Sequence, residues 1–346
     1  MIDLMKYRFD EIIEDCTKYG LKIPTNDYLE KGKFPIIDQG QDFIAGYSNS
    51  DNGIYSDVPA IIFGDHTRIF KYVDFPFFLG ADGVKILKAR KEISYKYLFY
   101  YFLQAKFPNT GYARHYKWLK ELEIPVPTIE KQNSIVNNLD KVTKIIKAHK
   151  ILLEKYDTLI KSRFIDLFGD PVTNEKGWKT ESLQQVAPAK PAKNNLNDKV
   201  WLLNLDMVES QTGEVIDYLY VNISDTGNST YQFDEGNVLY SKLRPYLNKV
   251  VIPEQSGICT SELVPLRPTE KLNRYFLANL LRTDFFVNFI NEKVAGAKMP
   301  RVSMDTFRAF ACILPPIELQ NQFASFVQQI DKSKFEIEKI VKMVYN

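Results

Sequence analysis

A proline-bearing stretch followed by a helical pattern occurs twice in this chain, 188 residues apart. Ile129-Glu130-Lys131-Gln132-Asn133 follows the prolines of residues 124–127, and Ile317-Glu318-Leu319-Gln320-Asn321 follows those of residues 313–316. Proline lacks the amide proton that goes unpaired at a helix start, and an acid there faces the positive end of the helix dipole. The sequence therefore predicts two long helices that begin alike.

Apolar residues in both helices recur at alternating steps of three and four, the pattern of a coiled-coil seam. Such a stripe needs a partner, and we expect the two helices to pair with each other, antiparallel because a globular part separates them. Two polar residues in the seam are expected to fix its register. The predicted seam is Ile135, Leu139, Val142, Ile146, His149 and Leu153 in the first helix and Phe323, Val327, Ile330, Lys334, Ile337 and Val341 in the second.

The segments around the helices repeat more faintly. Residues 6–12 resemble residues 177–183, strand patterns lie at 60–63, 75–78, 200–205 and 237–240, and aromatic-rich helical patterns lie at 95–105 and 274–282. A length of 346 residues suits about two domains. We predict an α+β fold with an internal pseudo-repeat, in which two mixed α/β domains at residues 1–123 and 169–311 are separated by two long antiparallel coiled-coil helices at 124–168 and 312–346.

The composition, 45% hydrophobic and 25% charged, is that of a folded globular protein. No run approaches 18 apolar residues and the first ten residues are charged, so we expect neither a membrane span nor a secretory leader. Cys16, Cys259 and Cys312 lie far apart in the sequence, which fits reduced thiols in the cytoplasm. We expect a cytoplasmic protein without membrane association or a disulfide framework.

The sequence contains none of the common motifs of an enzyme that acts on DNA. It has no Asn-Pro-Pro-aromatic or Asp-Pro-Pro-aromatic tetrapeptide for an extruded adenine, no glycine-rich nucleotide loop, no GxxxxGK[ST] and no Glu-x-Lys or Asp-x-Lys triplet. His66, His115 and His149 are isolated in the sequence, without a second metal ligand nearby. We therefore expect no catalytic residue and no metal site.

Several short segments, in this order, resemble the specificity subunits of Type I restriction-modification systems. They are residues 34–37 (FPII), 61–68 (IIFGDHTR), 80–85 (GADGVK), 168–171 (FGDP) and 236–246 (GNVLYSKLRPY), together with the two proline-to-helix starts. The resemblance covers nearly the whole chain. Each motif alone is weak, and their order makes the combination specific.

The resemblance implies that each globular part is a target recognition domain that reads one half of a bipartite, asymmetric site in double-stranded DNA. The helices would act as a spacer and as the docking site for two methyltransferase subunits, and restriction or motor subunits would complete the complex. It implies no cofactor in this chain, since S-adenosylmethionine, ATP and Mg²⁺ would be used by the partner subunits. One departure is that the second helix has no counterpart of residues 161–170.

Polar and basic loop residues near the predicted strands are candidates for DNA contacts. Arg68 suits the two acceptors of guanine, and Arg244 follows the equivalent strand of the second half. Residues 85–120 carry nine basic residues against one acid. Each of these side chains also fits a solvated turn or packing onto its own domain, as do Tyr112 and Tyr116. The candidates are Gln39, Gln41, His66, Thr67, Arg68, Lys85, Arg114, His115, Lys117, Lys242, Arg244, Lys298, Arg301 and Ser303.

Two other functions compete with a DNA-specificity subunit. An enzyme with its own methyltransferase or nuclease site would require a catalytic constellation that the motifs do not supply. A coiled-coil adaptor without a nucleic-acid role would lack salt-dependent affinity for DNA.

Overall fold

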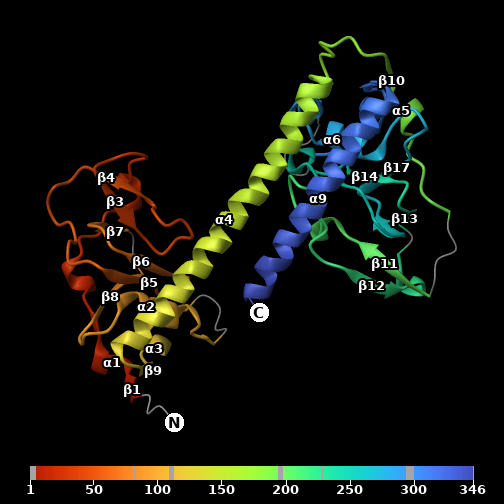
Figure 1. Cartoon of the computed structure of the whole chain (residues 1–346). Helices are drawn as coiled ribbons and strands as arrows, with labels where there is room; N and C mark the ends of the chain where they lie inside the picture. The colour runs from red at the N-terminus through yellow and green to blue at the C-terminus, as the bar shows by residue number, and fades with distance from the viewer. Residues whose placement is uncertain are drawn as a thin grey trace. The chain divides into compact units, whose positions relative to one another are not determined.

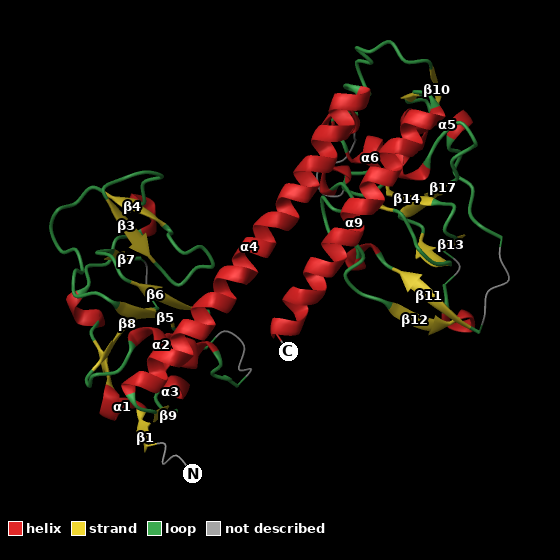
Figure 2. Cartoon of the chain, in the orientation of Figure 1, coloured by secondary structure: helices red, strands yellow, loops and turns green. Residues whose placement is uncertain are grey.

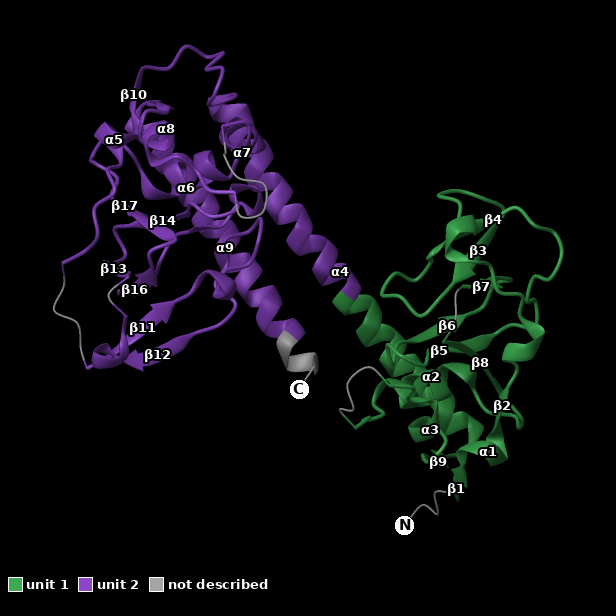
Figure 3. Cartoon of the chain, turned by 180° about the vertical axis from the view of Figure 1, so that it is seen from behind, with its two compact units in different colours: residues 1–146 green, residues 147–346 purple. Residues whose placement is uncertain are grey.

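The computed structural model describes residues 5–80, 83–108, 113–193, 198–227, 229–293 and 300–345. The chain divides into two compact units, residues 1–146 and 147–346 (Figure 3). Helix α4 (Ile129–Phe168) contributes to both units, and helix α9 (Ile317–Tyr345) belongs to the second (Figure 1). Both helices begin at the residues that the sequence repeat predicts.

The first unit contains two sheets and a strand pair. Four strands lie in the order β2-β8-β5-β6, three in the order β4-β3-β7, and β1 pairs with β9. Strand β5 (Ala60–Gly64) is buried throughout. The other elements are β1 (Met5–Arg8), α1 (Phe9–Ile12), β2 (Ile13–Asp15), β3 (Phe34–Ile37), β4 (Gly46–Ser48), β6 (Phe70–Val73), β7 (Phe78–Leu79), β8 (Val84–Ala89), α2 (Tyr95–Leu103), α3 (Tyr116–Leu119) and β9 (Glu123–Val126).

The second unit contains the same kinds of elements. Its sheets have the orders β12-β11-β16-β13 and β15-β14-β17, and β10 pairs with β18. The elements are β10 (Thr180–Ser182), α5 (Leu183–Val186), β11 (Lys199–Leu203), β12 (Leu219–Asn222), β13 (Thr230–Phe233), β14 (Val238–Ser241), β15 (Val250–Val251), β16 (Gly257–Thr260), β17 (Leu263–Leu266), α6 (Arg274–Arg282), α7 (Asp284–Asn291), α8 (Met304–Arg308) and β18 (Ala311–Ile313).

The two units share one strand topology. Strand β14 is antiparallel to β15 and β17, as β5 is to β6 and β8. Strand β11 is parallel to β16 and antiparallel to β12, as β3 is to β7 and β4. The antiparallel pairing of β13 with β16 has its counterpart in the bridge between Tyr55 and Phe77. The predicted internal repeat and mixed α/β class are therefore confirmed (Figure 2).

Each long helix is joined to its own globular part by the same side chain. Gln132 Nε2 donates to the Pro127 carbonyl at 2.8 Å, and its Oε1 accepts from the Ser94 amide at 2.9 Å. Gln320 makes the equivalent bonds to the Pro315 carbonyl and the Asn273 amide, at 2.8 and 2.9 Å. Ser94 and Asn273 cap the helices α2 and α6. The two glutamines, 2% and 0% exposed, thus fix the start of each long helix to an aromatic-rich helix.

The strand pairs correct two details of the sequence prediction. Residues 124–126 and 312–313 were assigned to the helices but form β9 and β18, which pair with β1 and β10 in the globular parts. In these pairs Tyr7 faces Ile124 and Glu181 faces Cys312. By this pairing Tyr7 corresponds to Glu181, so the openings of the two halves correspond at an offset of 174 residues. The sequence match of residues 6–12 with 177–183 has an offset three residues smaller. Similarity of residue types therefore misplaced the correspondence that strand pairing sets.

The two long helices pack in the second unit through the end of α4 and the start of α9. The Phe164 and Phe323 rings lie 5.5 Å apart, and Lys334 Nζ lies 2.9 Å from Asp157 Oδ1. The later residue of α9 thus contacts the earlier residue of α4, as in an antiparallel pair. The predicted antiparallel pairing is confirmed at this end, where the α9 seam residues Phe323, Val327 and Ile330 are buried. Seam residues Ile135, Leu139, Val142, Ile146, His149 and Leu153 of α4, and Ile337 and Val341 of α9, are only half-buried.

Candidate nucleic-acid interface

The turns that follow β5 and β14 each hold an arginine in the left-handed backbone conformation. Arg68 has a φ of 63° and Arg244 a φ of 49°. A residue other than glycine adopts this conformation at a cost of about 1–3 kcal/mol, and such residues gather at functional sites. Both side chains are exposed. The sequence predicted both arginines as DNA contacts, and the topology places them in equivalent turns of the two units.

A second chain segment crosses the end of each of these strands. The His115 amide donates to the Asp65 carbonyl at 2.8 Å, and the Val302 amide donates to the Lys242 carbonyl at 2.9 Å. In the second unit the Arg244 amide also donates to the Pro300 carbonyl at 2.8 Å. Candidates about fifty residues apart in the sequence are thereby brought into one loop cluster in each unit.

The turn that leads into β8 or β17 completes the cluster. The Asp65 amide donates to the Gly83 carbonyl at 2.7 Å, and the Lys242 amide to the Glu262 carbonyl at 3.1 Å. We name these clusters the first and second loop framework: residues 65–68, 83–85 and 113–117 in the first unit, and residues 242–248, 260–263 and 300–303 in the second. Backbone hydrogen bonds hold both frameworks, which leaves the side chains at their surfaces to differ.

In the first loop framework, Gln39 and His66 fill the space beside Gly83. The His66 amide donates to Gln39 Oε1 at 3.3 Å, and a Cβ at Gly83 would come within 2.8 Å of His66 Cδ2. Thr67 lies against Gly64 and is exposed. The predicted residues Gln39, His66, Thr67 and Arg68 therefore lie together.

The other candidates of the first unit differ in how exposed their side chains are and in whether they already bind another residue. Gln41, Arg114 and Lys117 are exposed, and the Lys117 ammonium lies 4.7 Å from the centre of the Trp118 ring. Lys85 instead binds Asp15 at 2.8 Å and lies over the Tyr116 ring at 4.8 Å. Burial raises the pKa of Asp15, but hydrogen bonds from Lys85 and Thr17 outweigh it and lower that pKa overall.

His115 is the predicted contact whose position contradicts a role at the surface. Its side chain is 1% exposed, and its Nδ1 lies 3.0 Å from the Asp65 carbonyl oxygen. The same aspartate, also buried, accepts the Tyr116 amide at Oδ1 at 2.7 Å. His115 and Asp65 therefore hold the crossing segment in place. Tyr112, named with Tyr116 from the sequence, lies outside the described residues.

In the second loop framework, Lys242 is half-buried, Arg244 and Arg301 are exposed, and Leu243 forms a β-bridge with Arg301. Ser303 is exposed and caps α8, its hydroxyl accepting from the Thr306 amide. Lys298 lies outside the described residues. Glu262, which binds Arg301 at 2.8 Å, was not predicted as a site residue, because a single acid between two strands forms no recognisable motif.

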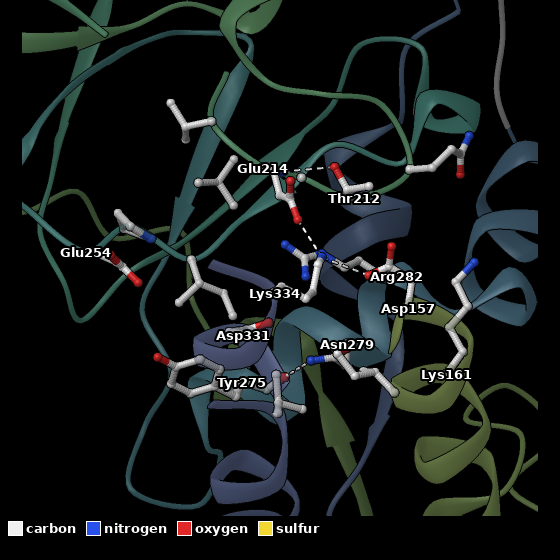
Figure 4. Close-up of a pocket in the computed structure, with 18 of the residues that line it drawn as sticks. Asp157, Lys161, Thr212, Glu214, Glu254, Tyr275, Asn279, Arg282, Asp331 and Lys334 are labelled. Atoms are coloured by element: carbon white, nitrogen blue, oxygen red, sulfur yellow. Dashed lines mark hydrogen bonds and ion pairs between the residues drawn. The ribbon is translucent and has the colours of Figure 1, made fainter. Parts of the chain in front are cut away.

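The second unit also contains a cavity of about 680 Å³ between α4, α6, α9 and residues 211–215 (Figure 4). Lys334 binds Asp157 of α4 at 2.9 Å and Glu214 of the loop at 2.5 Å. Burial lowers the pKa of Lys334, but the hydrogen bonds to Glu214 and Asp157 raise it by more. Nearby, Arg282 Nε donates to the Val250 carbonyl at 3.2 Å. Lys334, predicted to fix the helix register, thus joins both long helices to the loop.

Across the described ranges, no group of three or more His, Cys, Asp or Glu side chains is arranged to hold a metal ion. The helices within those ranges include none that combines the length and apolar character needed to cross a bilayer.

The sequence also matches a family model, the Type I restriction modification DNA specificity domain, over residues 1–155 and 175–343. The chain belongs to that family. The two matched stretches correspond to the two halves of the repeat, so each half carries one copy of the specificity domain.

Curated specificity subunits are similar to parts of this specificity-domain chain. One is the Type I restriction enzyme EcoR124I/EcoR124II specificity subunit of Escherichia coli, 32% identical over 148 residues, 38% of this chain and 36% of that protein. Another is the EcoDI specificity subunit of Escherichia coli, 26% identical over 134 residues, 39% of this chain and 30% of that protein. Each of these two matches spans about a third of the relative's own length.

A solved structure extends the likeness to the whole fold. The S subunit of a Type I restriction-modification system from M. genitalium superposes with a TM-score of 0.63, covering 99% of this chain and 93% of that chain at 15% identity. At this identity the likeness concerns the fold. It agrees with the two specificity domains that the topology and the family match give.

Proposed function

We propose that this chain is the DNA-specificity subunit of a Type I restriction-modification complex and binds a bipartite, asymmetric site in double-stranded DNA, one half-site per unit. The observation that carries the proposal is the pair of loop frameworks. They share their backbone hydrogen bonds and an exposed arginine at positive φ, but differ in the side chains around it. A common scaffold with different polar groups suits two half-sites of different sequence.

The proposed direct contacts are the exposed residues of these frameworks. Arginine donates two parallel hydrogen bonds to guanine, and the exposed cations also suit phosphate oxygens. His115 is left out because it is buried, and Lys85 is retained only as a residue that positions Tyr116 and Asp15.

Two methyltransferase subunits are the proposed partners of the helices. Apolar side chains of α4 and α9 remain exposed, among them Ile145 at 50% and Phe335 at 64%. Apolar side chains that stay exposed along both long helices support docking of a protein partner there. In this proposal the partners methylate adenine with S-adenosylmethionine, restriction subunits use ATP and Mg²⁺, and this chain supplies no catalytic group.

The test is to express the chain with its methyltransferase subunits and map the methylated adenines. We expect a two-part sequence with a fixed spacer. Arg68→Ala should alter one half of that sequence and Arg244→Ala the other, each reducing discrimination by about 1–3 kcal/mol, the range for a bidentate contact to a base. If either variant relaxed both halves equally, the assignment of one half-site to each unit would be wrong.

Two measurements separate this proposal from its rivals. Methyl transfer to DNA by the purified chain alone would favour an enzyme with its own catalytic site. Absence of salt-dependent DNA binding, alone and with methyltransferase subunits, would favour an adaptor.

A further inference from the structure

The second loop framework holds one carboxylate among basic residues. Glu262 lies in the turn between β16 and β17, and its main-chain carbonyl accepts the Lys242 amide at 3.1 Å. Arg301 donates to Glu262 Oε1 at 2.8 Å, with side-chain exposures of 57% for the arginine and 25% for the glutamate. The bridge between Leu243 and Arg301 places this ion pair next to the turn that carries Arg244.

The two carboxylate oxygens of Glu262 are not in the same state. Oε2 is buried and accepts no hydrogen bond from any part of the chain that the structure describes, so DNA cannot reach it. Oε1 is engaged by Arg301 and keeps a second lone pair, which makes it the acceptor that this partly exposed side chain can offer to DNA. A carboxylate at a DNA-facing surface repels the phosphates, so it weakens binding to any sequence. What it can gain from DNA is a hydrogen bond from a base amino group, as between a carboxylate and the N4 amino group of cytosine.

The equivalent position of the first unit has no side chain. Gly83 makes the same backbone bond as Glu262, accepting the Asp65 amide at 2.7 Å, and has a φ of 86°. A Cβ there would come within 2.9 Å of Gln39 Nε2 and 2.8 Å of His66 Cδ2. An amide and an imidazole thus occupy in the first unit the place that an acid and a guanidinium occupy in the second. The units therefore differ in chemistry at a position that their scaffolds share.

We propose that Glu262, held by Arg301, is a specificity-determining residue of the second unit and accepts a hydrogen bond from a base amino group in the major groove. This inference rests on the proposed function. Glu262 lowers affinity for DNA in general and gives preference to sequences that place an amino group within its reach. A discriminating group that costs affinity is a known way to obtain specificity.

The test uses the full chain with its methyltransferase subunits and compares Glu262→Gln with the wild type. Glutamine keeps the shape but removes the negative charge. We expect the preferred base to change or relax at one position of one half-site, with discrimination reduced about 5- to 150-fold, the range for one good base contact. Affinity for unrelated duplex DNA should rise, since a repulsive charge is removed.

Glu181→Gln is the matched control, because Glu181 binds Lys271 at 2.6 Å with side-chain exposures of 34% and 54%, close to those of the Glu262 pair. It should leave the methylated sequences and both affinities unchanged. Arg301→Ala should alter the same half-site as Glu262→Gln.

Two results would overturn the inference. One is a Glu262→Gln complex that methylates the wild-type sites with undiminished discrimination. The other is an equal fall in affinity for specific and unrelated DNA, which is expected if Glu262 only holds Arg301 against a phosphate. A wild-type chain that recognises no two-part sequence would instead refute the proposed function, and the inference with it.

Discussion

Gln320 illustrates how much one side chain can fix in this molecule. Besides the Pro315 and Asn273 bonds it donates to the Lys271 carbonyl at 3.2 Å, so a single buried amide satisfies three main-chain groups from two segments, residues 271–273 and Pro315. Gln132 does the same work in the first unit with two such bonds. Gln132 and Gln320 each lie three residues before the predicted seam begins, at Ile135 and Phe323, and their partners belong to the globular parts and not to the other long helix.

Gln320→Ala should lower the free energy of unfolding of the second unit by about 2 kcal/mol, because buried main-chain groups lose their partners. Hydrogen exchange at the Asn273 amide should accelerate as well. Gln328→Ala, at an exposed position of the same helix, should change the stability by less than about 0.5 kcal/mol. Equal stability of the two variants in urea unfolding would show that the amide is not needed for the attachment.

At the scale of elements, the first part of α4 is attached to α2 by a cluster of polar side chains. Asp140 accepts hydrogen bonds from Lys96 Nζ and Tyr100 OH, both at 2.7 Å. Burial raises the pKa of Asp140, but these hydrogen bonds lower it by more, while the hydrogen bond to Asp140 raises the pKa of Lys96. The cluster is partly exposed, so its contribution to stability is modest.

Asp140→Asn should lower the stability of the first unit by about 1 kcal/mol at neutral pH. Because the pKa of Asp140 is lowered in the folded state, its carboxylate stabilises the fold at pH values above the ordinary pKa near 3.8. This stabilisation is lost as the pH falls through the folded-state pKa. Because the pKa of Lys96 is raised in the folded state, its ammonium stabilises the fold at pH values below its ordinary pKa. This stabilisation is lost as the pH rises past the folded-state pKa. The difference between wild type and variant, measured by urea unfolding, should therefore be flat around neutrality and vanish in acid.

The exposed Lys141→Gln on the same turn is the control and should leave that pH profile unchanged. A difference between wild type and Asp140→Asn that persisted in acid would mean that packing, and not the ion pair, is responsible.

Most elements were predictable because their signals are local. Helix α6 has the bounds predicted from its aromatic pattern, and β5 and β14 lie within one residue of theirs. The run at residues 75–78 was misplaced, since only Phe78 belongs to β7, whose pairing with β3 is set by a distant strand. The meeting of residues 65–68 with 113–117 and the role of Glu262 depend on tertiary packing, and no local pattern encodes them.

At the scale of the whole molecule, we propose that the helices act as a ruler, the spacer that sets the distance between the two half-sites, so that the length of α4 determines the spacing of the DNA site. Removing residues 145–151, one heptad, keeps the face of the helix nearly in register and shortens it by about 10 Å. The spacer in the methylated sequence should shorten by about three base pairs, taking 3.4 Å for each. Both half-sites should keep their sequences.

Mapping methylated adenines again provides the measurement. Lys150→Ala, which changes a residue of the same segment without altering its length, is the control and should keep the wild-type spacing. A deletion variant with the original spacer would contradict the ruler role.

The loop frameworks also bear on how such a protein can change over generations. Their loops are joined by main-chain hydrogen bonds, from Asp65 to Gly83 and from Val302 to Lys242 to Glu262, which depend little on the side chains there. Substitutions at the exposed tips of the loops therefore cost little folding stability, while they alter the groups offered to a ligand. The positions that tolerate substitution are therefore the same positions that decide what is bound. Proteins that evolve from one such scaffold can change their ligand without first acquiring compensating mutations in the core.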